Sequence, residues 1–410
     1  MLDVLPPESA RWIDVVTRFA ERARRFGFGL LMTPILEHYE VFQRVGENTD
    51  VVRKEMYEFV DRGGRHLALR PEGTAPVVRA FVQHRPPVPW KVWYVAPNFR
   101  AEQPQKGRYR QHWQLGAEVL GPPDPDIDVE TIALAHGFYR DLGLKQVTLL
   151  INSMGDDESR ARYVDVLTAY WREHASLLGD EMARAEANPL RILDSKREDW
   201  QEMLEHAPQL GEYLTDESRT HFEHVEAGLQ ALGIDYDIAP RLVRGFDYYT
   251  STVFEFTSNA LDAAQNAVGG GGRYDRLAAD MGGPPTPGMG FGIGIERVLI
   301  ACDSEDVLPV PEPHCDVFVV DAVGGTEATR LAYELREAGL TVERAYGGRA
   351  VKKQWSAADR SGAQYGVMLA PKEMEQGKVA VKDMRTGEQV DVPRDEVAAV
   401  IATRLEGRPS

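Results

Sequence analysis

The sequence predicts a protein of mixed α and β structure that folds as two domains. Its 410 residues fit two or three domains. A proline-rich, acidic linker at residues 303–314 ends the first predicted domain, residues 1–310, and precedes the second, residues 315–410. Residues 155–235 are rich in Glu, Arg, Ala and Leu at helical spacing. They predict a mainly helical insertion in a first domain that otherwise contains strands and hairpins.

Local patterns predict the elements of the first domain in chain order. Apolar residues at helical spacing behind Ser9, a possible N-cap, predict a helix that runs to about Phe26. Alternation and turn residues predict a strand at 30–35, a hairpin at 57–60 and 66–69, a helix at 74–82, strands at 91–102 and 110–120, a helix at 128–142, strands at 147–152, 235–239 and 248–256, and a helix from 294 to 301.

The second domain alternates strand and helix, which is typical of an α/β fold. The predicted elements are a strand at 315–320, a helix at 326–338, a strand near 341, a helix at 352–361 and a strand at 365–369.

Composition narrows the class of protein. With 43% hydrophobic and 27% charged residues, the chain is typical of a soluble globular enzyme. No apolar run approaches the roughly 20 residues that span a bilayer, and the first residues lack a signal core, so we expect a cytoplasmic protein. Two cysteines, Cys302 and Cys315, cannot build a disulfide framework or a thiolate zinc site. A net charge of -17 argues against broad RNA binding and leaves room for a confined basic patch.

The predicted strand at 110–120 carries polar residues at every second position. Alternate side chains of a strand share a face, so Arg110, His112, Gln114, Gly116 and Glu118 would point the same way. A solvated face would give the same pattern, but Gly116 favours a site, because a missing side chain leaves room for a ligand. The preceding strand places two further charges, Arg100 and Glu102, two residues apart.

Further segments are rich in chemically useful groups. Residues 244–256 join a cation, a carboxylate and two phenols to a strand-like run, which suits a small polar substrate beside phosphate. Residues 290–297 form a glycine-rich strand that enters a helix at Arg297, although a surface arginine after such a turn would look the same. The pattern is neither a Walker loop nor a dinucleotide fingerprint. Residues 69–74 and 269–275 add a second carboxylate and a run of four glycines.

The order and spacing of these segments resemble the histidyl-tRNA synthetases, a family of class II aminoacyl-tRNA synthetases. The resemblance extends to residues 191–196 in the insertion and to 352–354 and 381–385 in the second domain. It implies an α+β class II catalytic core, an antiparallel sheet flanked by helices, with a helical insertion. It also implies a C-terminal α/β anticodon-binding domain.

The resemblance implies roles at the nucleotide. Arg100 would hold the α-phosphate of ATP and the amino-acid carboxylate, Glu102 would meet the adenine amino group, and Arg297 would stack on adenine and reach the γ-phosphate. Arg108 and His112 would also contact ATP, His112 by stacking on adenine. Arg244 matches the catalytic arginine of the family beside the α-phosphate.

The resemblance also implies the amino-acid site. Glu72, Gly73 and Thr74, assisted by Gln114, would bind the α-ammonium group of L-histidine. Two further side chains, Glu118 and Tyr249, would contact the imidazole nitrogens. Tyr248 and residues 269–272 would line the pocket.

The implied activity is that of a histidine–tRNA ligase, with ATP, L-histidine and tRNA-His as substrates and Mg²⁺ entering with ATP. No protein ligand for the metal is assigned. Pro34 matches a motif at the dimer interface of the family, which implies a homodimer, although a proline that simply ends a strand fits equally well. Two other functions remain open: a synthetase-like regulatory subunit of ATP phosphoribosyltransferase and a noncatalytic tRNA- or amino-acid-binding module.

Overall fold

The computed structural model describes residues 3–46, 51–101, 107–193, 195, 197–243, 248–261, 266–311 and 314–406. The chain divides into two compact units, residues 1–309 and 310–410, each with its own sheet and core. Within the described ranges, none of the helices has the length and apolar character that crossing a bilayer requires.

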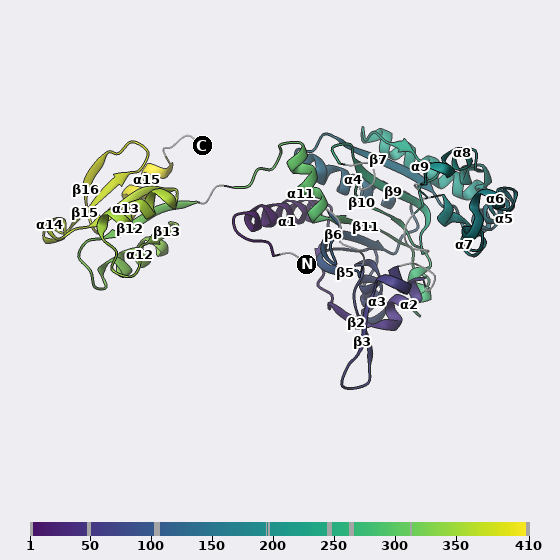
Figure 1. Ribbon diagram of the computed structural model, residues 1–410, viewed down its shortest axis with the longest axis horizontal. Helices are drawn as coiled ribbons and strands as arrows, with labels where there is room; N and C mark the ends of the chain where they lie inside the picture. Colours follow the sequence, from purple (N-terminus) through teal and green to yellow (C-terminus); the bar gives the residue numbers. More distant parts are fainter. Residues whose placement is uncertain are drawn as a thin grey trace. The chain divides into compact units, whose positions relative to one another are not determined.

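An eight-stranded sheet forms the centre of the first unit (Figure 1). Its six inner strands pair antiparallel, while each edge strand pairs parallel to its neighbour. In sheet order, the strands are β1 (Gly29–Leu30), β5 (Trp90–Phe99), β6 (Gln111–Leu120), β11 (Gly288–Gly294), β10 (Ala267–Arg273), β9 (Thr250–Ser258), β7 (Val147–Ser153) and β8 (Asp237–Ile238). The predicted sheet flanked by helices is confirmed.

The two faces of this sheet differ in chemistry. On β6, Leu115, Ala117 and Val119 point into an apolar core shared with α1 (Glu8–Arg25), α4 (Asp126–Asp141) and α11 (Ile295–Ser304). The alternate residues, among them Gln114 and Glu118, point to the opposite face, as the sequence predicted. Over that face lie α2 (Tyr39–Gly46), α3 (Thr74–His84), α10 (Leu277–Asp280) and a small sheet of β2 (Leu36–His38), β4 (His66–Leu69) and β3 (Tyr57–Val60).

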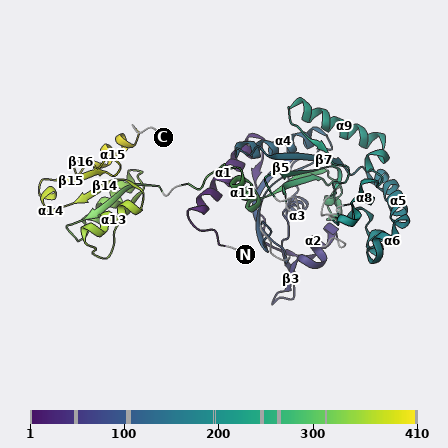
Figure 2. The same cartoon turned by 45° about the horizontal axis from the view of Figure 1, so that its top comes forward.

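The predicted helical insertion is confirmed. It contains α5 (Asp157–Glu173), α6 (Ala175–Leu178), α7 (Met182–Ala187), α8 (Gln201–Glu205) and α9 (Asp216–Ala231), with short 3₁₀ turns between them. Helices α5 to α8 gather at one end of the unit (Figures 1 and 2). They enclose Trp171, whose indole N–H donates to the carbonyl of Pro189 over 3.0 Å. Helix α9 packs along α4.

The second unit has a five-stranded sheet and an α/β arrangement, as predicted. In sheet order its strands are β13 (Val342–Arg344), β12 (Cys315–Asp321), β14 (Ala363–Leu369), β15 (Lys378–Asp383) and β16 (Gln389–Pro393). The first three run parallel and the last two continue antiparallel. The helices are α12 (Glu327–Glu337), α13 (Val351–Arg360), α14 (Pro371–Glu375) and α15 (Val397–Glu406). The prediction omitted everything after β14.

Two local predictions differ from the structure. The single strand expected at 30–35 is wrong, because the chain leaves β1 after Leu30, passes Pro34, and joins a different sheet as β2. The run of four glycines at 269–272, which was not predicted as a strand, forms most of β10. A Cβ on Gly271 would lie 1.9 Å from the carbonyl oxygen of Gly290, so this close strand pair tolerates no side chain there.

Candidate active site

A cavity of about 360 Å³ lies on the polar face of the large sheet. It is bounded by the start of α3 and by strands β5, β6, β9, β10 and β11. Most of the predicted site residues line it: Glu72, Gly73, Thr74, Arg100, Arg108, His112, Gln114, Tyr248, Tyr249 and Arg297. Glu118 lies behind its wall, while Glu102 and Arg244 fall outside the described residues.

The segment before α3 turns a carboxylate inward. Glu72 accepts hydrogen bonds from the backbone N–H groups of Thr74, over 2.6 Å, and Ala75, over 2.7 Å. These amides begin α3 and have no partner within the helix, so the carboxylate satisfies them. Burial raises the pKa of Glu72 and outweighs these two bonds. The local fold therefore fixes Glu72 at the cavity wall.

Glu118 is fully buried and surrounded by hydroxyl groups. One carboxylate oxygen accepts from the hydroxyl of Thr74, over 2.8 Å, and from that of Tyr94, over 3.3 Å. The other accepts from the hydroxyl of Tyr274, over 2.6 Å. Burial raises the pKa of Glu118 to about 8, against the lowering effect of these donors. At neutral pH the group is therefore mainly a neutral acid that can either donate or accept a hydrogen bond.

Glycines make room for this cluster. A Cβ on Gly116 would lie 2.1 Å from the Tyr94 ring, and one on Gly73 would lie 2.4 Å from it. A Cβ on Gly290 would lie 1.7 Å from the Glu118 carboxylate. The sequence predicted that the space at Gly116 holds a ligand, but the ring of Tyr94 fills it.

Guanidinium groups occupy another part of the cavity wall, and backbone carbonyls orient them. Arg100 donates from Nε to the carbonyl of Pro71 over 3.0 Å. Arg297 donates to the carbonyls of Gly107, over 3.1 Å, and Ala267, over 2.7 Å. Burial, and then the charge of Arg100, lowers the pKa of His112 to about 3, so its imidazole is neutral and suited to stacking. Fixed positive charge of this kind suits a phosphate group.

Some important residues were missed. Tyr94 lies opposite Gly116 in the β5–β6 pairing, so its place depends on strand register. Tyr274 and Glu296 lie within the predicted segments 269–275 and 290–297, but neither pattern predicts a role for them. Glu296 lines the cavity and accepts from the backbone N–H of Trp113 over 2.9 Å, and burial raises its pKa to about 7.

No metal centre can be named among the described residues, since they include no group of three or more His, Cys, Asp or Glu side chains placed to hold an ion. Carboxylate groups do line the cavity, through Glu72, Glu255 and Glu296. A metal that arrives on a substrate phosphate would therefore meet both acidic and basic side chains here.

Comparison with known proteins identifies the family. Residues 1–298 match the model of the family described as histidyl-tRNA synthetase, and residues 309–404 match that of an anticodon binding domain. The histidine–tRNA ligase of Geobacillus thermodenitrificans is 46% identical over 98% of this chain and 97% of its own length. That of Rubrobacter xylanophilus is 47% identical over 94% of each. The crystal structure of apo S. aureus histidyl-tRNA synthetase superposes with a TM-score of 0.83, at 34% identity over 98% of each chain. The chain belongs to the histidyl-tRNA synthetase family.

Proposed function

We propose that the chain activates L-histidine with ATP to form histidyl-adenylate and then transfers histidine to the 3′ end of tRNA-His. The histidine–tRNA ligases that cover nearly its whole length support this activity. The observation that carries it is the composition of one cavity. Arg100, Arg108 and Arg297 offer positive charge, while the Glu72–Thr74 turn and Gln114 offer polar groups beside them.

In the first step, a carboxylate oxygen of histidine bonds to the α-phosphorus of ATP. The bond from that phosphorus to the β-bridging oxygen breaks, and pyrophosphate leaves with the electron pair. Negative charge builds on the phosphoryl oxygens, so positioning and fixed positive charge account for most of the catalysis. Arg100 would supply that charge. Arg244, outside the described residues, keeps the role implied by the resemblance, and no side-chain nucleophile is required.

The amino acid would lie at the hydroxyl-rich end. Glu72, Thr74 and Gln114 would bind its α-ammonium group. Gln114 is oriented by the amide N–H of Asn98, which donates to its oxygen over 2.6 Å. The imidazole nitrogens would meet Glu118 and Tyr249, with Glu118 reached through the Thr74 side of its carboxylate. A site that hydrogen-bonds a polar side chain rejects analogues without those groups by roughly 10⁴- to 10⁵-fold.

Mg²⁺ would enter with ATP as part of the substrate and neutralise phosphate charge. Glu255 and Glu296 are carboxylates of the same cavity wall, together with Glu72. In the second step, the 3′ ribose hydroxyl of tRNA would attack the adenylate carbonyl and release AMP. The second unit, which matches an anticodon binding domain, would hold the tRNA at its other end.

A homodimer in the cytoplasm is the expected form of the protein. Large apolar side chains are exposed on and around β1, β2 and β3: Leu30, Met32, Ile35, Leu36, Phe59 and Val60. Exposed apolar patches of this kind mark interaction surfaces. A second copy of the chain is the partner that the family resemblance implies.

The two alternative functions are less well supported. A regulatory subunit of ATP phosphoribosyltransferase or a noncatalytic binding module would have little need for Arg100 and Arg297 beside the acidic amino-acid site. The match of residues 309–404 to an anticodon binding domain also favours a ligase.

Histidine-dependent exchange of pyrophosphate into ATP tests the proposal. The wild type should catalyse it, and Arg100→Ala should lower the rate on the order of 10²- to 10³-fold, the cost of removing one fixed charge-stabilising group. Arg24→Ala is the matched control, because Arg24 is exposed on α1. Folded wild-type protein without exchange would refute the ligase activity, and full exchange by Arg100→Ala would refute the role of this residue.

A further inference from the structure

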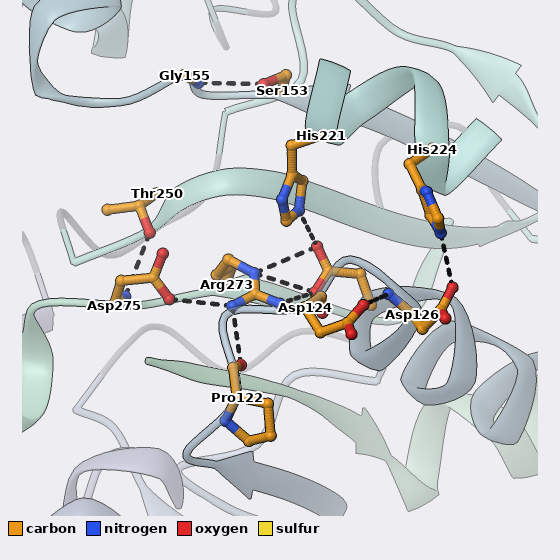
Figure 3. A network of polar contacts seen from close by, with 11 residues as sticks. Pro122, Asp124, Asp126, Ser153, Gly155, His221, His224, Thr250, Arg273 and Asp275 are labelled. Atoms are coloured by element: carbon orange, nitrogen blue, oxygen red, sulfur yellow. Dashed lines mark hydrogen bonds and ion pairs between the residues drawn. The ribbon is translucent and has the colours of Figure 1, made fainter. Parts of the chain in front are cut away.

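A buried ionic network joins the helical insertion to the end of β10 (Figure 3). Arg273, only 1% exposed, donates from Nε to the carboxylate of Asp128 over 3.0 Å. Asp128 lies on α4 and has no exposed surface. Its other oxygen contacts Nε2 of His221, on α9 of the insertion, over 2.8 Å. Side chains from three separate elements therefore meet at one carboxylate.

The guanidinium of Arg273 is held on all sides. Its remaining nitrogens donate to the carbonyls of Asp124, over 3.0 Å, and Pro122, over 3.5 Å, and to the carboxylate of Asp275 over 3.3 Å. Burial raises the pKa of Asp128, but the His221 hydrogen bond and the Arg273 charge outweigh it and hold that pKa below its ordinary value. The carboxylate of Asp128 is thus ionised and held in a fixed geometry. Buried ion pairs contribute little net stability, so a defined orientation is the property that this arrangement supplies.

The network lies one residue along the chain from the proposed amino-acid site. Arg273 directly precedes Tyr274, whose hydroxyl donates to Glu118 over 2.6 Å. The backbone N–H of Asp275 donates to the hydroxyl of Thr250, the residue after Tyr249, over 3.2 Å. The β9–β10 pairing is irregular at this point, between Gly272 and Arg273, so the segment is held by β11 on one side, through a Tyr274 N–H bond of 2.7 Å to the carbonyl of Gly288, and by the Arg273 network on the other.

The same two helices carry a second pair that makes a natural control. One turn further along α9, His224 contacts Asp126 of α4 over 2.7 Å. These side chains are 51% and 73% exposed, whereas those of His221 and Asp128 are 16% and 0% exposed. The exposed pair tethers α9 to α4 without touching Arg273.

We propose that His221, Asp128 and Arg273 form a positioning triad that sets the orientation of Tyr274, and through it Glu118, for binding the histidine substrate. The helical insertion is thereby coupled to amino-acid recognition. This inference rests on the proposed function, because it assigns Glu118 to the histidine site. His221 is a positioning residue and touches no substrate.

Pyrophosphate exchange with separately varied histidine and ATP tests the triad, alongside thermal unfolding. His221→Ala should raise the KM for histidine on the order of 10-fold, the size expected for loss of one hydrogen bond to a charged group. The KM for ATP should stay within about twofold. His221→Gln, which keeps a donor, should restore most of the loss, and His224→Ala should match the wild type. Asp128→Asn gives a second measurement of the same effect.

A double-mutant cycle tests the route. Because His221 is proposed to act through Tyr274, the KM for histidine should rise no further in His221→Ala/Tyr274→Phe than in Tyr274→Phe alone. A lowered melting temperature with both KM values unchanged would overturn the triad and leave the ligase activity standing. So would equal effects of His221→Ala and His224→Ala. A folded wild type without histidine-dependent exchange would overturn both the function and the inference.

Discussion

Replacing Gly290 by alanine would place a methyl group on the carboxylate of Glu118. The Cβ would lie 1.7 Å from Oε2 and 2.7 Å from the carbonyl oxygen of Ala117, whereas ordinary contact begins at 3.4 Å. The side-chain oxygen would have to move by roughly 1.7 Å. The Ala117 carbonyl cannot yield as easily, because Ala117 pairs with Phe291 between β6 and β11.

The displacement has two costs. Overpacking a buried site destabilises a protein by about 1–3 kcal/mol. Moving Oε2 also breaks its 2.6 Å hydrogen bond with Tyr274, which costs about 1–3 kcal/mol when a buried partner is left unpaired. The free energy of unfolding should therefore fall by roughly 2–6 kcal/mol. Since Glu118 is proposed to bind imidazole, kcat/KM for histidine should fall about 10- to 100-fold.

Urea unfolding measures the first quantity and pyrophosphate exchange at varied histidine measures the second. Gly29→Ala is the control, because Gly29 belongs to the same sheet and a Cβ there would have no atom within 4 Å. It should leave both quantities near the wild type. A folded Gly290→Ala protein with wild-type stability and kcat/KM would show that Glu118 is neither tightly held nor needed for histidine.

Three further predictions follow from single features. Since the pKa of Glu118 is raised from 4.5 to about 8 by burial, the stability that its proton provides is present below pH 4.5 and lost as pH rises through about 8. The wild type should lose roughly 5 kcal/mol of unfolding free energy relative to Glu118→Gln over that range in urea, and parallel profiles would contradict this. Tyr139→Phe should leave the free energy of unfolding in urea unchanged or raise it by up to about 1 kcal/mol, because the buried hydroxyl has no hydrogen-bond partner among the residues that the structure describes; a clear loss of stability would reveal one. A chain shortened to residues 1–309 should keep histidine-dependent exchange and lose charging of tRNA-His in an aminoacylation assay. Full charging by this shortened chain would show that tRNA binding does not depend on the second unit.

The elements that sequence predicted well are those whose signals are local. The hairpin of β3 and β4 forms with the predicted strand bounds, because alternation and a tight turn lie within thirteen residues. Strand β10 could not be found this way. Glycine has low strand propensity, and four in a row indicate a turn. The strand exists because β9 and β11 pair with it on both sides and approach too closely for side chains.

The residues of the candidate site also differ in whether a local sequence signal marks them. Glu72, Arg100 and Arg297 lie within recognisable segments and do share one cavity. Tyr94 carries no such signal, because its role depends on facing Gly116 across the β5–β6 register. The network of Arg273, Asp128 and His221 joins residues separated by 145 and 93 positions, and no local pattern reports such a contact.

The surroundings of Glu118 link its stability to the selectivity that we propose for it. The hydroxyls of Thr74, Tyr94 and Tyr274 donate to it and lower its pKa, but burial outweighs them and raises the pKa to about 8, so the acid holds its proton at neutral pH. An imidazole carries one N–H donor and one acceptor nitrogen, and it can therefore bond to either form of the acid. An apolar side chain would leave the buried group without a substrate partner, while a permanently charged one would force its ionisation. With the role proposed for Glu118, any change that moves this carboxylate, such as Gly290→Ala, is therefore expected to alter stability and histidine recognition together.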